Sequence, residues 1–180
     1  MAATSTKQSA AAGRRLTEMA NDRVVAEIEM LYRSEYRRFL RVAIAILLDE
    51  QLAHDAVQEG FARALKKRRS YRADGPLEGW LWRVVVHAAL DARRRFQGET
   101  PSDVVVDQPS ANGNGSDEAG VRRWIAALPE RQRLAVYLRY YADLDYRAIA
   151  RVLDVEVGTV SATLASAHRA LRRTLEEVSK

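Results

Sequence analysis

A stretch rich in glycine, proline and small polar residues divides this sequence into two parts. It covers residues 97–120, reads QGETPSDVVVDQPSANGNGSDEAG, and holds two prolines and four glycines. Such a composition does not continue a helix and is typical of a flexible tether. The sequence therefore predicts two small domains, over residues 23–97 and 120–180, joined by a linker over residues 98–119. Residues 1–22 are small and polar, and we expect them to form a disordered tail.

Apolar residues on both sides of the linker recur at steps of three and four, which is the period of an amphipathic helix. The pattern predicts helices over about residues 22–48, 50–68, 76–96 and 121–128, and from residue 129 onward. Pro76 and Pro129 suit the first turns of two of these helices. No long stretch alternates with period two. The predicted fold class is therefore all-α, with two small helical bundles and no sheet.

The charge of the chain is distributed in blocks. The formal net charge is +1 over residues 1–22, +5 over 23–97, −5 over 98–119 and +4 over 120–180. Two basic domains are thus joined by an acidic linker. Basic blocks are often no more than a solvated surface, but an isoelectric point of about 9.7 also fits a polyanionic partner.

Several functional classes find no support in the composition. The chain has no cysteine, which excludes disulfides, thiolate zinc sites and cysteine nucleophiles. Its three histidines lie far apart in sequence, and it has no glycine-rich phosphate loop. We therefore expect a protein that is not an enzyme and that needs no metal or other cofactor. Val42–Leu48 is too short to cross a bilayer and the N-terminus lacks a signal-peptide core, so we expect a cytoplasmic protein without a membrane partner.

The second domain has the spacing of a helix-turn-helix motif. Tyr146–Leu153 is predicted to be its first helix, with the small Ala150 where two helices approach each other. Asp154 occupies the turn position that needs a left-handed backbone, and Val155 and Val160 are expected to be buried between the helices. An ordinary αα-hairpin is the alternative interpretation.

The second helix of this motif carries no charge from Gly158 through Ala167. The bidentate contact between arginine and guanine, the commonest specific base contact, is therefore not available there. Ser161, Thr163 and Ser166 offer hydroxyl groups, and Ala162 offers a methyl group for a thymine methyl. We expect weak direct readout of bases, supplemented by phosphate contacts from arginines further along the helix.

A helix of the first domain combines aromatic and cationic side chains. Its sequence, GPLEGWLWRVVVHAALDARRRFQ over residues 75–97, follows the basic segment LKKRRSYRAD. Rings that stack on bases, beside cations that attract phosphates, suit single-stranded DNA. Structural alternatives exist: Trp80 is in phase with the apolar face and favours the core, whereas Trp82 lies on a different face. Arg93–Arg95 alone also suit a helix C-terminus that complements its own dipole.

The preceding helix, AHDAVQEGFARALKK over residues 53–67, carries a polar stripe at steps of three and four. The members of the stripe are Asp55, Gln58, Glu59 and Arg63. Taken alone, these residues favour a solvated face with internal ion pairs, each worth only about 0.3–0.5 kcal/mol.

Five short segments of the chain together resemble one protein family. LPERQR, LDYRAIA and VGTV in the second domain are similar to the C-terminal domain of the small bacterial sigma factors of extracytoplasmic-function type. GWLWRVVVHAALDARRR and the run with the polar stripe resemble the N-terminal domain of the same family. The resemblance covers about residues 25–96 and 117–177, which is most of the chain.

The resemblance implies a transcription initiation factor that works within RNA polymerase. It assigns the polar stripe to the clamp coiled coil of the β′ subunit. It assigns the second domain to the minus-thirty-five promoter element and the flap of the β subunit. An anti-sigma protein is a further candidate partner. A helix-turn-helix regulator acting alone is the alternative function, but it leaves the polar stripe and the tryptophan–arginine helix without a role.

The resemblance also assigns promoter contacts to named residues. Two departures from the family pattern qualify them: His87 stands where asparagine is usual, and the uncharged run after VGTV replaces a basic one. Expected contacts with the minus-ten element come from Tyr71, Arg72, Trp80, Trp82, Arg83, His87, Arg93 and Arg94. Expected contacts with the minus-thirty-five element come from Gly158, Thr159, Ser161, Ala162, Thr163, Ser166, Arg169 and Arg172.

Overall fold

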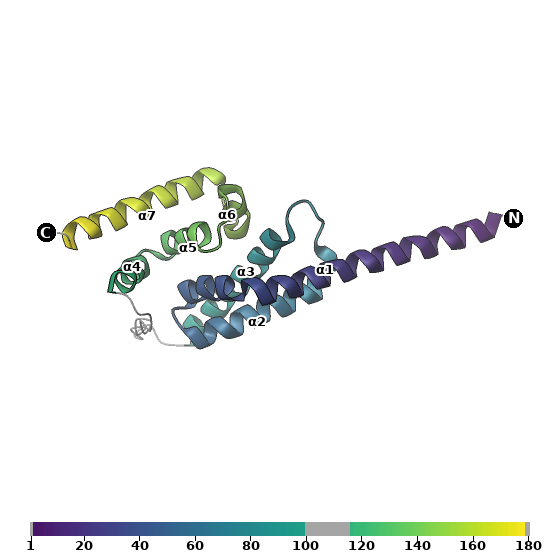
Figure 1. The fold of residues 1–180 in the computed structure, drawn as a ribbon, viewed down its shortest axis with the longest axis horizontal. Coiled ribbons are helices and arrows are strands. Elements are labelled where there is room, and N and C mark those ends of the chain that lie inside the picture. Colours follow the sequence, from purple (N-terminus) through teal and green to yellow (C-terminus); the bar gives the residue numbers. More distant parts are fainter. Residues whose placement is uncertain (1, 100–115, 179–180) are drawn as a thin grey trace.

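The structure, a computed structural model, describes residues 2–99 and 116–178 of the chain, and within these ranges it is helical and contains no strand. The all-α prediction is therefore confirmed. Figure 1 shows two groups of helices, one formed by α1 to α3 and one by α4 to α7, lying against each other. The helices are α1 (Ala2–Leu47), α2 (Glu50–Lys67), α3 (Leu77–Glu99), α4 (Ser116–Ala126), α5 (Glu130–Tyr140), α6 (Tyr146–Leu153) and α7 (Val157–Val178), with a short 3₁₀ turn, η1 (Arg68–Ser70), after α2.

The helix ends are fixed by local capping. Leu48 takes a left-handed backbone with φ 57° directly after α1, and its N–H donates to the carbonyl of Ile44 at 2.7 Å. Asp49 then caps α2, because its side chain accepts a hydrogen bond from the N–H of Leu52 at 2.7 Å. The chain therefore reverses in two residues, which places α1 and α2 side by side.

The core of the first bundle is built around three aromatic rings. Phe39 on α1 stacks on Trp82 of α3 with ring centroids 3.9 Å apart, and it meets Phe61 of α2 edge to face at 5.0 Å. Phe39 and Trp82 are both 0% exposed. One ring from each helix thus joins all three, which fixes the angular position of α3 about its own axis.

The contact between α2 and α3 depends on small residues. Ala53, Ala56 and Ala64 are buried on α2, and Gly60 lies among them on the same face. A Cβ placed on Gly60 would lie 2.8 Å from the Cα of Val85 on α3. The backbones of the two helices therefore approach closely at this glycine.

Two boundaries differ from those predicted. The structure continues α1 back to Ala2, where the sequence predicted a disordered tail over residues 1–22. This segment is rich in alanine, the strongest helix former, and it extends a helix already nucleated by packing. Likewise, α3 continues to Glu99 and α4 begins at Ser116, so both enter the predicted linker. The rest of that linker, residues 100–115, lies outside the described residues.

The helix-turn-helix geometry in the second group of helices follows the prediction. Asp154 has a left-handed backbone with φ 55°, and its N–H bonds to the carbonyl of Ala150 as the cap of α6. Val160, at 1% exposure, packs into the interior, and Val155 is half-buried. α7 packs on both α5 and α6.

The two helical groups are packed together, which the sequence analysis did not predict. α5 packs on α1 and α6 packs on α3, and one hydrophobic core runs through both groups. A single charged residue, Arg133 of α5, is buried among the described residues, at 6% exposure. The linker therefore does not keep the domains apart in this conformation.

Within the described ranges, none of the helices combines the length and the apolar character needed to span a bilayer.

We expect Gly60→Ala to lower the thermal stability of the protein. The new methyl group would meet the backbone of Val85, and overpacking of this kind typically costs about 1–3 kcal/mol. Gly79→Ala is the control, because nothing lies within 4 Å of a Cβ at that position of α3. Unfolding followed by circular dichroism should show a lower Tm for Gly60→Ala only. Equal Tm values for the two variants would contradict the close α2–α3 contact.

Candidate functional site

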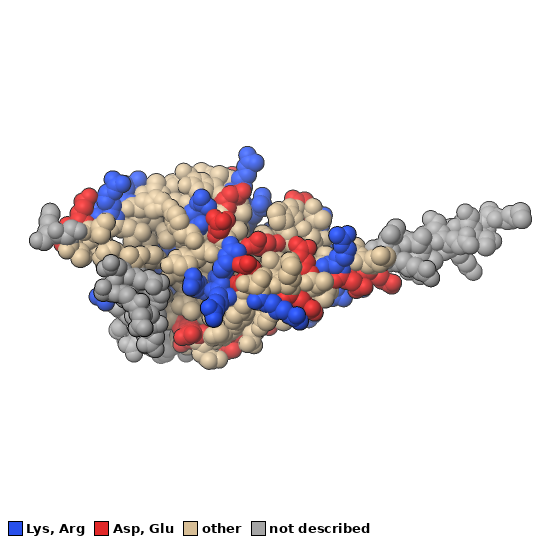
Figure 2. All heavy atoms as spheres, viewed as in Figure 1, with Lys and Arg blue, Asp and Glu red and all other residues tan. Residues whose placement is uncertain are grey.

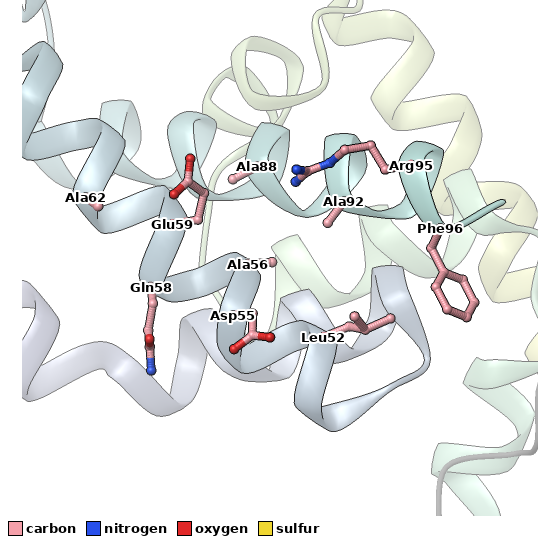
Figure 3. Close-up of a pocket in the computed structure, with 10 residues that line it drawn as sticks. All are labelled: Leu52, Asp55, Ala56, Gln58, Glu59, Ala62, Ala88, Ala92, Arg95 and Phe96. Carbon is pink, nitrogen blue, oxygen red and sulfur yellow. The ribbon is translucent and has the colours of Figure 1, made fainter. Parts of the chain in front are cut away.

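An open groove of about 740 Å³ lies between α2 and α3. Its floor consists of alanines, with Ala56 on α2 and both Ala88 and Ala92 on α3 (Figure 3). Ala56 and Ala88 are buried, so small apolar side chains close the bottom of the groove. Its form follows from the same small residues that let α2 and α3 approach each other.

Polar side chains surround this apolar floor. Asp55 and Glu59 stand on the α2 side and Arg95 on the α3 side, and all three are exposed (Figure 3). Gln58, also exposed, points away from α3 (Figure 3). The structure thus gathers three members of the predicted polar stripe at one rim, facing solvent. An apolar floor with a largely acidic rim suits a helical partner with an apolar ridge and basic flanks.

The fourth member of the stripe, Arg63, is engaged within the protein. Its guanidinium donates to Glu59 at 2.7 Å and to Asp91 of α3 at 2.9 Å. Asp91 also accepts a hydrogen bond from Arg94 at 2.7 Å. The bond from Arg63 is the main reason that the pKa of Asp91 is held below its ordinary value. Arg63 therefore joins α2 to α3 and orients Glu59.

A second candidate surface follows α3 on the side away from the core. Arg83 is exposed, and His87 and Asp91, one and two turns further along, are half-buried on the same stripe. The Nε2 atom of His87 is buried and has no hydrogen-bond partner among the described residues. This stripe offers a cation and an imidazole to a ligand lying along α3.

The loop before α3 carries the aromatic part of this surface. The ring of Tyr71 lies 5.7 Å from that of Trp80, and both side chains are half-buried. The hydroxyl of Tyr71 donates to the carbonyl of Gly75, and burial raises the pKa of that phenol. Arg72, which follows Tyr71 in the loop, is exposed. The next residue, Ala73, has a left-handed backbone with φ 56°.

The expectation that Trp82 contacts DNA is wrong for this conformation. Its side chain is 0% exposed, stacked on Phe39, and its indole N–H faces Glu78 at 3.3 Å. The sequence placed Trp82 on a face different from that of Trp80, which is correct. Because α3 is covered by α1 as well as by α2, the face with Trp82 is the more deeply buried one.

Two further arginines assigned to DNA have partners within the chain. Arg93 donates to the carbonyl of Ile46 at 3.2 Å and pairs with Glu130 of α5 at 2.9 Å. Arg94, which is exposed, pairs with Asp91. Arg94 can still reach a phosphate, whereas Arg93 is held between the two helical groups.

The third candidate surface is the outer side of α7. Gly158, Thr159, Ser161 and Ala162 are exposed in its first turns, followed by the exposed Arg169 and Arg172. The face is therefore polar or methyl-lined at its start and cationic further along.

The hydroxyl groups of this helix are not equivalent. Thr163 and Ser166 are only half-exposed, and the hydroxyl of Ser166 accepts a hydrogen bond from Gln132 of α5 at 3.3 Å. His168 is hydrogen-bonded to the hydroxyl of Tyr140 at 2.9 Å. Ser161 is therefore more exposed than Thr163 and Ser166, and Ser166 faces the neighbouring helix.

The surface charge is mixed where it is visible. Figure 2 shows basic and acidic side chains interleaved over one face of the molecule, without a continuous basic field. Some of the basic side chains are paired with acidic ones, as in Arg63–Asp91 and Arg93–Glu130. This face therefore offers no continuous basic surface to a polyanion.

Comparisons with known proteins identify the family of this chain. Residues 31–99 match the family described as Sigma-70 region 2, and residues 120–174 match the one described as Sigma-70, region 4. The ECF RNA polymerase sigma factor SigM of Mycobacterium tuberculosis is 31% identical over 159 residues, which cover 87% of this chain and 80% of SigM. This chain belongs to the extracytoplasmic-function family of RNA polymerase sigma factors. It accordingly binds core RNA polymerase and directs promoter recognition and the initiation of transcription.

Solved structures of sigma factors share the fold. RpoE of Bartonella quintana, solved in complex with the anti-sigma factor NepR, superposes with a TM-score of 0.67 at 18% identity, covering 83% of this chain and 97% of that one. CnrH, solved in complex with the cytosolic domain of CnrY, gives a TM-score of 0.68 at 20% identity, covering 91% and 97%.

Sequence reasoning missed two sets of residues in this sigma factor. The first comprises the alanines of the groove floor, because a spacing of four on α3 does not differ from that of an ordinary apolar helix face. The second comprises the arginines that join the two domains, Arg38 and Arg133. No local pattern distinguishes these from solvated arginines, because their partners lie about a hundred residues away or on another helix.

We expect Asp91→Asn to destabilise the first domain at neutral pH. The pKa of Asp91 is lowered in the folded state, so its carboxylate stabilises the fold above the ordinary pKa. That contribution is lost as the pH falls through the lowered pKa. Because the side chain is 41% exposed, the effect should be only about 0.5–1 kcal/mol. Urea unfolding should show a difference from the wild type that shrinks toward pH 3, and no such trend for Asp22→Asn.

Proposed function

We propose that the three surfaces divide the work of initiation among them. The α2 rim of the groove, with Asp55, Gln58 and Glu59, binds the clamp coiled coil of the polymerase β′ subunit, and Arg63 holds Glu59 in position. The observation that carries this assignment is the exposed acidic rim over a preformed apolar floor. A helix-turn-helix regulator acting alone would have no use for it.

The minus-ten element is assigned to α3 and the loop before it. Arg83 and Arg94 are exposed and Arg72 stands in the loop, so these cations suit the backbone of the separated strand. Tyr71 and Trp80, whose rings lie 5.7 Å apart, would hold an extruded base, and His87, on the same helix as Trp80, would add a polar contact. Trp82 has a structural role in this proposal, because it stabilises α3 from inside the core.

The minus-thirty-five element is assigned to the outer face of α7. Gly158, Thr159, Ser161 and Ala162 would lie nearest the bases, and Arg169 and Arg172 would contact phosphates. Thr163 and Ser166 would contribute at the edges of the face, since both are half-buried. Such a surface discriminates weakly between bases, and its binding depends on contacts with DNA phosphates and on DNA shape.

In this proposal the protein acts by binding and not as an enzyme. It works in the cytoplasm, where polymerase and promoters occur. The β flap is the expected second polymerase contact, made by the helix-turn-helix domain. An anti-sigma protein is a candidate regulator, as the partners of RpoE and CnrH in the solved complexes suggest.

We expect the double variant Asp55→Ala, Glu59→Ala to bind core polymerase at least about ten-fold more weakly. Hydrogen bonds to charged groups contribute roughly 1.5–3 kcal/mol each, and two would be lost. The control is Glu176→Ala with Glu177→Ala, which removes the same charge from exposed positions at the end of α7. Affinity is measured with labelled protein and purified core enzyme. Unchanged affinity in a normally helical double variant would refute the assignment.

We expect Arg83→Ala to reduce promoter opening by the holoenzyme more than Ser161→Ala does. Arg83 is an exposed cation on the strand-separating surface, whereas a hydroxyl contact at a wet interface is worth only about 0.5–1.5 kcal/mol. Permanganate reactivity of unpaired thymines measures the opening. If Ser161→Ala reduces promoter opening more than Arg83→Ala does, base contacts by α7 matter more than the cations of α3, and the prediction is wrong.

A further inference from the structure

A row of arginines runs along the exposed side of α1. Arg33, Arg37 and Arg41 follow each other at steps of four residues, and all three side chains are exposed. Residues four apart lie on one face of a helix, about 6 Å apart along its axis. Arg33 and Arg37 make no hydrogen bond or ion pair with any residue that the structure describes. Arg41 lies over the ring of Tyr141 at 5.5 Å, which is a contact with a ring face and not with a carboxylate. We call these three arginines the α1 stripe.

The α1 stripe has few carboxylates of its own helix within reach. The positions three and four residues away from Arg37 hold Arg33, Ser34, Leu40 and Arg41. Like charges at a spacing of four repel each other and destabilise a helix. The stripe is therefore not the usual solvated face, on which cations alternate with carboxylates and form internal ion pairs.

Other arginines of the chain fall into two groups. The first group pairs with a carboxylate three or four residues away, as in Arg38–Glu35, Arg63–Glu59 and Arg94–Asp91. In the second group, Arg83 and Arg169 have no carboxylate at these positions, and both are assigned to DNA in the proposed function. Arg37 and Arg41 resemble the second group, so their charges are available to an external anion.

The α1 stripe belongs to the helix that lies beside the proposed base pocket. η1, which directly precedes Tyr71, packs on α1. Burial, and after it the charge of Glu27 on α1, raise the pKa of Tyr71. Arg38 of α1 reaches Glu78 in the first turn of α3 at 3.6 Å. A strand whose base is held at Tyr71 and Trp80 thus follows α3 in one direction and meets α1 in the other.

Carboxylates near the pocket influence where on α1 a phosphate is favoured. Glu35 and Glu78 are both paired with Arg38, at 2.5 and 3.6 Å. Glu27 is exposed and disfavours a phosphate beside the pocket itself. The stripe begins six residues further along α1, about 9 Å away. The electrostatics therefore favour the phosphates at the stripe.

We propose that the α1 stripe binds the phosphates of the separated promoter strand, on the side of the extruded base away from α3. The inference rests on the proposed assignment of Tyr71 and Trp80 to that base. Guanidinium groups suit this ligand, because each can donate two parallel hydrogen bonds to one phosphate. The stripe spans about 12 Å of helix and offers one cation to each phosphate of a short run of nucleotides. It adds affinity for the open strand without reading its sequence.

The first test measures the salt dependence of binding. The holoenzyme is titrated with a promoter fragment that carries an unpaired bubble at the minus-ten element, at several salt concentrations. The variant is Arg33→Gln with Arg37→Gln. Each phosphate contact on a single strand contributes about 0.7 to the slope of log affinity against log salt, so we expect the slope to fall by roughly 1.4. The control is Arg123→Gln with Arg131→Gln, which removes the same charge from exposed positions of α4 and α5 and should keep the wild-type slope.

The second test locates the strand. Because the chain has no cysteine, Arg37→Cys can carry an iron chelate that cleaves DNA close to it. In open complexes we expect cleavage of one strand, in a few nucleotides next to the minus-ten element. The same chelate on Gln51→Cys, an exposed position at the start of α2, should not cut there.

Three results would overturn the proposal. One is an unchanged salt slope in the Arg33→Gln, Arg37→Gln variant, and another is the absence of cleavage from Arg37→Cys. The third is weaker binding of the double variant to core polymerase with the DNA salt slope unchanged, because the stripe would then contact an acidic protein surface. Arg83→Ala separates this inference from the proposed function. If Arg83→Ala impairs promoter opening and the stripe variant has the wild-type slope, only the stripe proposal fails. If neither variant has an effect, the assignment of the minus-ten element to α3 fails as well.

Discussion

The close approach of α2 and α3 at Gly60 is the contact on which the first domain depends. Because Gly60 has no side chain, the backbones of α2 and α3 approach closely at this position. Alanines of both helices leave an open groove between them. The same approach brings Arg63 within reach of Asp91, so that one ion pair spans the two helices. The groove floor, the position of Glu59 and the direction of the α3 stripe all follow from this single crossing.

Groups of the protein itself compete with DNA for its arginine side chains. The chain is strongly basic, yet many of its guanidinium groups bind carbonyls or carboxylates of the protein itself. Arg133 binds three carbonyls, Arg38 binds two, and Arg93 binds one together with Glu130. Other cations, such as Arg83, Arg169 and Arg172, remain exposed. Net charge alone would overstate the affinity of the free protein for DNA.

The start of α7 likewise offers few cations to DNA, because it carries no charged side chain. A helix without arginine in its first turns binds DNA through shape, methyl groups and backbone contacts, so it depends on being delivered to the correct place. Delivery by polymerase raises the effective concentration of this domain at the upstream element. A helix that reads bases weakly is therefore suited to act as part of the holoenzyme.

The sequence by itself determined the helical fold class, most helix limits, the family and the helix-turn-helix. These depend on local periodicity, on caps such as Asp49 and on the left-handed position of Asp154, all of which are written in short stretches of sequence. The sequence favoured Trp80 for the core, whereas Trp82 is the fully buried tryptophan, because α1 as well as α2 covers α3. The sequence also could not reveal that the domains close on each other, since the carbonyls bound by Arg38 and Arg133 belong to every residue and carry no sequence signal. Only the tertiary structure brings the end of α1 beside α5, where a buried cation completes the hydrogen bonding of that helix end.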